Sequence, residues 1–159
     1  MSRVVHCGSI VLIICPPKLD EKFVDELSRE FDKIFARRQR FACITDTSLL
    51  TSMPDAVNRK HLANWISRPD IQAVQTELNV GSSTILESTA MRAVMTALYW
   101  LWTPPTPQHA AKDLDEALTW SVSKLVAADP RLVPNEAILK AQVRMAAPHR
   151  SPNKAASAG

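Results

Sequence analysis

The most suggestive polar cluster in this sequence is Asp46, Thr47 and Ser48. It closes an apolar segment, residues 41–46, whose composition is typical of a buried strand. In open α/β sheets, ligands bind in the crevice outside the carboxyl ends of parallel strands. A carboxylate and two hydroxyls at that place form a candidate binding or switch site, and the alternative is ordinary turn and cap chemistry.

A single cation interrupts an apolar segment further along the chain. Arg92 is the one charged residue in residues 90–102, which their composition and length predict to be a covered helix. It falls in the first turn, where the helix dipole disfavours positive charge, so a carboxylate such as Glu87 or Asp46 is expected to offset it. Arg92 is therefore a candidate contact for an anion, and the alternative is that it anchors a loop.

Aromatic side chains at the end of the same segment form a candidate interface. Tyr99, Trp100 and Trp102 lie beside a proline-rich stretch. Because neighbouring helical positions point in different directions, one tryptophan is expected in the core and the other at the surface. Exposed aromatic residues often mark protein contacts.

Residue types that carry most enzyme and metal chemistry are not grouped in this sequence. Its three glycines are too scattered to form a phosphate-binding loop, and its four histidines share no paired spacing. No G-x-S-x-G nucleophile elbow is present. Cys15 could serve as a nucleophile at a strand end, but a buried thiol is the favoured interpretation. We expect no catalytic residue, no metal and no cofactor.

Cysteine usage and charge restrict the compartment and the partners. The odd number of cysteines and the lack of a C-x-x-C pair argue against a disulfide framework and favour a reducing, cytoplasmic location. The apolar run at residues 10–15 is too short for a membrane span or a signal peptide. A net charge of +3 is a weak excess, so specific nucleic-acid binding is not expected.

Alternating strand and helix signals position these candidates. We expect strands at residues 3–7, 10–15, 41–46, 80–86 and 108–111. Helices are expected at 20–38, at 52–78 with a break near Arg68 and Pro69, at 90–102 and at 114–128. This order predicts an α/β fold with a mainly parallel sheet of four to five strands and flanking helices. Residues 1–128 are expected to form this domain, and 129–159 an extension with a short helix at 135–145 followed by disorder.

Two further patterns are residues 88–101, STAMRAVMTALYWL, and residues 114–120, LDEALTW, which follow a proline-rich run. They resemble the third and the last helix of bacterial STAS-like proteins, the SpoIIAA-like family. The resemblance covers about residues 3–128. It implies the STAS fold and a small regulatory or scaffolding domain that binds other proteins.

The resemblance also implies a phosphorylation switch. In anti-sigma-factor antagonists of this fold, a serine or threonine at the start of the second main helix is phosphorylated, which makes Thr47, Ser48 and Ser52 candidates here. Their Asp-Ser-x-Gly pattern is replaced in this chain by Ser52, Met53 and Pro54. We expect Ser52 to cap the following helix, with Pro54 early and Asp55 three residues on.

Three hypotheses about function follow. The first is a non-catalytic module that binds a protein partner and is able to form a homodimer through its apolar third helix. The alternative is a domain for a lipid or anionic amphiphile, with Arg92 at the mouth of an apolar pocket. The third is an enzyme, which would require an accessible pair of titratable groups within hydrogen-bond reach.

Overall fold

The computed structural model describes residues 3–89, 91–93, 95 and 103–148. Five strands form one sheet in the order β1-β2-β3-β4-β5. β1 and β2 are an antiparallel hairpin, and the other neighbours are parallel. The predicted α/β class and mainly parallel sheet are confirmed. The strands are β1 (Val4–Cys7), β2 (Ile10–Ile14), β3 (Phe41–Asp46), β4 (Asn79–Ile85) and β5 (Gln108–Ala111).

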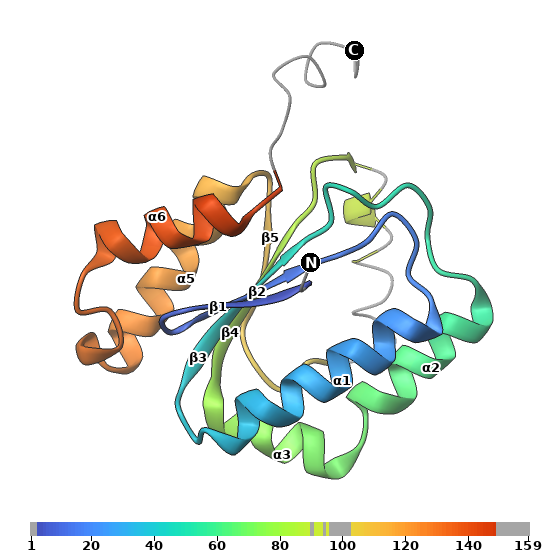
Figure 1. Ribbon diagram of the computed structural model, residues 1–159, viewed down its shortest axis with the longest axis horizontal. Helices are drawn as coiled ribbons and strands as arrows, with labels where there is room; N and C mark the ends of the chain where they lie inside the picture. Colours follow the sequence, from blue (N-terminus) through green and yellow to red (C-terminus); the bar gives the residue numbers. More distant parts are fainter. Residues whose placement is uncertain (1–2, 90, 94, 96–102, 149–159) are drawn as a thin grey trace.

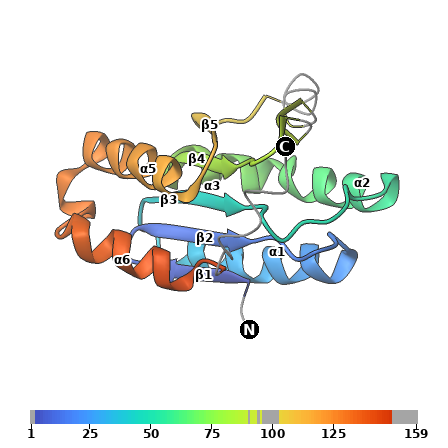
Figure 2. The same ribbon diagram turned by 90° about the horizontal axis from the view of Figure 1, so that it is seen from above.

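Helices cover both faces of the sheet (Figure 1 and Figure 2). One face carries α1 (Glu21–Ala36), α2 (Ala56–Ile66) and α3 (Pro69–Leu78), and the other carries α5 (Leu114–Ala128) and α6 (Glu136–Ala146). A short 3-10 helix, η1 (Pro130–Leu132), links the last two. Parallel crossovers are nearly always right-handed, so when each new strand joins the same side of the sheet, as β3 and β4 do, the helices between them lie on one face. The second face is left to the segment after β5.

The two faces have cores of different character. Beneath α1, the Phe31 ring meets Phe35 and Trp65 nearly edge-on, with ring centroids 5.5 Å and 5.8 Å apart. The layer beneath α5 and α6 is mainly aliphatic and includes fully buried side chains from four strands and both helices. Among these are Ile10, Leu12, Ile44, Ile85, Ala111, Leu118, Leu125 and Val143.

The start of α2 differs from the prediction. Asp55 caps this helix, since its carboxylate accepts a hydrogen bond from the Asn58 N–H at 2.8 Å, and the predicted cap at Ser52 is wrong. Pro54 explains the difference, because a residue before proline avoids helical backbone and Met53 therefore cannot begin the helix. Aspartate is in any case as good an N-cap as serine. The predicted break holds, since α2 ends at Ile66 and α3 begins at Pro69.

The segment after α5 belongs to the packed structure. The short helix expected at residues 135–145 is present as α6, and its Leu139 and Val143 are buried against the sheet. The Ser9 hydroxyl, in the β1–β2 turn, donates a hydrogen bond to the Leu132 carbonyl at 2.6 Å. Residues 130–147, which we expected to form an extension, thus cover the hairpin side of the second face.

Candidate functional site

The polar cluster after β3 lies where the sequence predicts, but its side chains face inward. Asp46 is 1% exposed and accepts a hydrogen bond from the Ser48 N–H at 2.8 Å. The Thr47 hydroxyl donates to the Ile85 carbonyl at 2.5 Å, which ties the ends of β3 and β4 together. The Ser48 hydroxyl is buried and has no hydrogen-bond partner among the described residues. Thr47 and Ser48 are therefore poorly placed to receive a phosphate in this conformation.

The remaining predicted residues are not gathered into one site. Ser52 is exposed in the loop before α2, three residues ahead of the true cap. Arg92 is exposed, and its Nε donates to the Leu86 carbonyl at 3.2 Å, so it anchors the chain that follows β4. The predicted interface residues, Tyr99, Trp100 and Trp102, lie outside the described residues.

The thiols in the centre of the sheet are chemically quiet. Burial raises the pKa of Cys15 to about 12, and the Asp46 carboxylate adds to this shift. Burial likewise raises the pKa of Cys43 to about 12. Since the thiolate is the reactive species, neither residue is suited to act as a nucleophile near neutral pH.

A polar hollow, which the sequence analysis missed, lies at the β5 side of the sheet. His109 of β5 and Glu116 of α5 are joined at 3.0 Å between Nε2 and Oε1, and both are partly exposed. The His109 ring stacks on Trp120 at a centroid distance of 5.2 Å, and the Lys124 ammonium lies 5.3 Å from the same indole. The hollow has a volume of about 680 Å³.

The histidine–carboxylate pair orients an imidazole, but no described contact links it to a nucleophile. Of the two hydroxyls that line the hollow, that of Ser123 donates to the Trp120 carbonyl at 2.6 Å. The other, on Thr119, lies on an exposed position of α5. Catalysis by such a pair requires the activated group within hydrogen-bond reach of the base. The hollow thus offers hydrogen-bonding groups rather than an assembled catalytic site.

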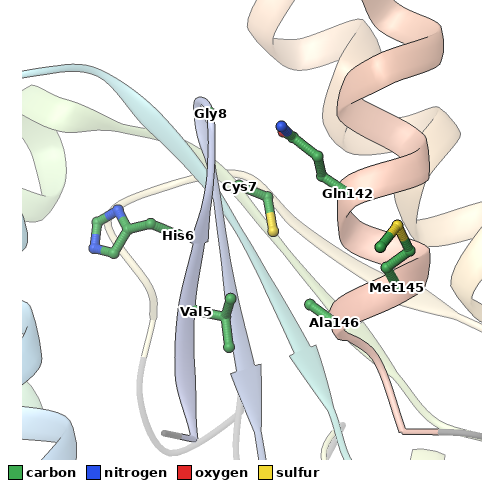
Figure 3. A pocket seen from close by; sticks show the side chains of 7 residues that line it. All are labelled: Val5, His6, Cys7, Gly8, Gln142, Met145 and Ala146. Carbon is green, nitrogen blue, oxygen red and sulfur yellow. The ribbon is translucent and has the colours of Figure 1, made fainter.

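A second hollow, the β1–α6 groove, lies at the opposite side of the sheet (Figure 3). It has a volume of about 430 Å³. Cys7 and Val5 of β1 lie on the side of the strand that faces α6, whereas His6 points away from that helix. The lining is Val5, His6, Cys7, Gly8, Gln142, Met145 and Ala146.

Met145, which lines the groove, belongs to an exposed apolar strip on α6. Met145 is 81% exposed and Ile138 is 56% exposed, although Leu139 and Val143 on the same helix are buried. Residues seven apart share one side of a helix, so Ile138 and Met145 lie along a common line. This spacing is the signal in the sequence that could have revealed the strip.

The β1 strand also forms one edge of the sheet. No described strand pairs with its outer side. In a hairpin with a two-residue turn, the residues that flank the turn form a hydrogen-bonded pair and the pairs alternate from there. Cys7 pairs with Ile10 and His6 with Val11. It follows that the backbone N–H and C=O of His6 point outward from the sheet.

Positive charge accompanies this edge on the face opposite the groove. The Arg37 Nη1 lies 3.3 Å from the His6 Nδ1, and Arg37 is exposed at the end of α1. Burial is the main cause that lowers the pKa of His6, with Arg37 adding to the effect and Glu30 opposing it. The imidazole is therefore mostly neutral near pH 7, and Arg37 carries the charge.

Comparisons with known proteins leave the family open. Among the described helices, none combines the length and hydrophobicity needed to cross a membrane. Nor do the described residues group three or more histidine, cysteine or acidic side chains where a metal ion could be held. No protein-family model matches the chain, and neither a curated protein nor a solved structure matches it significantly.

Proposed function

We propose that this chain is a non-catalytic regulatory or scaffolding module that binds a protein partner at the β1 edge. The observation that carries the proposal is the exposed Met145 beside the β1–α6 groove, which borders an edge strand of the sheet. A partner segment that lies along this groove would bury the apolar surface and reach the outward N–H and C=O of His6.

Membership of the STAS-like family is part of this proposal. An N-terminal hairpin followed by parallel strands added in sequence order supports it. A reducing compartment such as the cytoplasm is also proposed, because all three cysteines are free and buried. Binding of a lipid or amphiphile receives less support, since such ligands favour enclosed apolar cavities and both hollows described above are open to solvent.

The experiment starts from a displayed library of random dodecapeptides selected on the wild-type protein. Synthetic versions of the selected peptides are then titrated by calorimetry against His6→Pro and Met145→Glu. Proline removes the outward N–H of His6 and is tolerated on edge strands. Met145→Glu places a charge on the apolar strip. Because the Met145 side chain is 81% exposed, it contributes little to the hydrophobic core. We expect both variants to weaken binding by about tenfold or more.

The matched control is Val57→Glu, which charges an equally accessible apolar residue, 76% exposed, on α2. It should bind the peptides as the wild-type protein does. Circular dichroism checks that each variant is folded, and if His6→Pro is not, the comparison of Met145→Glu with Val57→Glu decides alone. Equal affinity for Met145→Glu and Val57→Glu, or a library that yields no binding peptide, would contradict the proposal.

A further inference from the structure

The sulfur that solvent can reach among the described residues is concentrated in one side chain. Met145 is 81% exposed, whereas Met53, Met91 and Met95 are partly buried. The three cysteines are only 4% to 5% exposed. An oxidant that attacks sulfur from the solvent therefore meets the Met145 thioether first.

The β1–α6 groove holds both kinds of sulfur, and only one of them is open to oxidation. Cys7 lines the groove from β1 and Met145 lines it from α6 (Figure 3). Burial raises the pKa of the Cys7 thiol, and the form of cysteine that reacts with peroxides is the thiolate. A thioether carries no proton, so its oxidation requires only access to the sulfur. The groove thus protects Cys7 and presents Met145.

Oxidation of Met145 would change the binding surface and leave the fold intact. The residues that hold α6 on the sheet are Leu139 and Val143, which are buried and contain no sulfur. Methionine sulfoxide is polar, whereas the strip formed by Ile138 and Met145 is apolar. A partner that covers the strip would have to remove water from the S=O group, which costs free energy unless a hydrogen bond replaces it.

We propose that Met145 is a site of reversible oxidation that weakens partner binding at the β1–α6 groove. This inference rests on the proposed function. Hydrogen peroxide transfers one oxygen atom to the Met145 Sδ: the O–O bond breaks, an S–O bond forms, the sulfur loses two electrons and the peroxide leaves as water. A methionine sulfoxide reductase reverses the change, because two thiols supply two electrons, become a disulfide and release the oxygen as water.

The first measurement tests which methionine reacts. The folded protein is treated with hydrogen peroxide at neutral pH, and peptide mass spectrometry follows the gain of one oxygen atom at each methionine. Met145 should be oxidised at least about fivefold faster than Met53, Met91 and Met95, because access to the sulfur limits the rate.

The second measurement tests the consequence for binding, with the library-selected peptides described above. Wild-type protein oxidised at Met145 should bind them about tenfold more weakly, and treatment with methionine sulfoxide reductases and a dithiol should restore the affinity. Met145→Leu keeps an apolar side chain of similar volume without sulfur, and should bind equally before and after peroxide. Met53→Leu, at a partly buried methionine outside the groove lining, is the matched control and should lose affinity as the wild-type protein does.

The outcomes separate this inference from the function beneath it. Equal oxidation rates for the four methionines, or oxidised wild-type protein that binds as the untreated protein does, would overturn the inference. The proposed function still stands in that case if Met145→Glu binds more weakly than Val57→Glu. A loss of affinity that persists in peroxide-treated Met145→Leu would assign the effect to another residue and also overturn the inference. Equal affinity of Met145→Glu and Val57→Glu would overturn the proposed function, and the inference with it.

Discussion

The two edges of the sheet differ in how far their polar groups are already satisfied. At the β5 edge, Glu116 holds His109 at 3.0 Å, and Lys124 lies over Trp120. At the β1 edge, apolar side chains are exposed and Arg37 has no described carboxylate partner. A surface whose charges are paired internally must break those contacts to bind, whereas an exposed apolar side chain such as Met145 gains contacts outright.

This contrast teaches that an accessible titratable pair is a weak sign of function by itself. The His109–Glu116 pair meets the geometric requirement set for an enzyme, yet no described contact connects it to a reacting group. The contact at the β1 edge, between His6 and Arg37, contains no carboxylate, yet the apolar border of the groove there suits recognition. Three predictions, in order of decreasing effect, test whether the two edges differ as described.

The largest effect is expected from detaching α6 from the β1 hairpin. Leu139→Ala removes a buried side chain and should lower the free energy of unfolding by about 3 kcal/mol. Ile138→Ala, at the adjacent exposed residue, should change it by less than about 0.5 kcal/mol. Urea unfolding measures both values. Similar losses for the two variants would show that α6 does not pack on the sheet as described.

The glycines near the two edges should respond to alanine for different reasons. At Gly81 of β4, a new Cβ would lie 2.7 Å from the Trp120 Cη2, so a rigid ring must move and we expect a loss of about 2 kcal/mol. At Gly8, the backbone has φ +55° and the nearest atom is the flexible end of Leu139, so about 1 kcal/mol of backbone strain dominates.

Thermal unfolding of both variants checks this pair. If Trp120 packs over β4, Trp120→Leu in the Gly81→Ala background should recover part of the lost stability, because the smaller side chain leaves room for the new methyl group. The same ring change should not rescue Gly8→Ala, because Trp120 is not among the close neighbours of that position. Rescue of both variants, or of neither, would contradict the packing at the β5 edge.

The smallest effect concerns the pH dependence of stability at the β1 edge. The pKa of His6 is lower in the folded protein than the usual 6.5, mainly through burial, so the unfolded chain binds the proton more readily. Stability from this residue is fully present above pH 6.5 and is lost as the pH falls toward the folded pKa. In denaturant titrations, the wild-type protein should therefore lose stability relative to His6→Gln on acidification. A constant difference between them would contradict the burial of His6.

The sequence predicted elements well because their signals are local. The start of α1, where the Asp20 carboxylate accepts a hydrogen bond from the Phe23 N–H, and the break before Pro69 both depend on residues within a turn of one another. The prediction that Ser52 caps α2 was wrong because Ser52 and Asp55 are both suitable N-caps, and Pro54 excludes the earlier helix start. The prediction that Thr47 and Ser48 follow the end of β3 is confirmed, but the hydrogen bond of the Thr47 hydroxyl and the burial of the Ser48 hydroxyl depend on packing that spacing does not encode.

The β1–α6 groove could not be predicted from the sequence, because the residues that line it are far apart along the chain. Its walls are Val5 and Met145, which come from opposite ends of the chain and meet only because α6 returns to the first hairpin. The pair formed by His109 and Glu116 likewise spans a strand and the following helix. Nothing short of the three-dimensional fold brings these residues together.

The strand order also has a consequence for synthesis on the ribosome. Ile10, Leu12 and Ile44, on one face of the sheet, are present once β3 has emerged, yet α5 and α6, which cover that face, are made after all five strands. A nascent chain that ends before residue 114 therefore carries an uncovered aliphatic surface, the kind of surface that causes partly made proteins to aggregate. Folding of this domain must be completed late, after translation has passed the final helix.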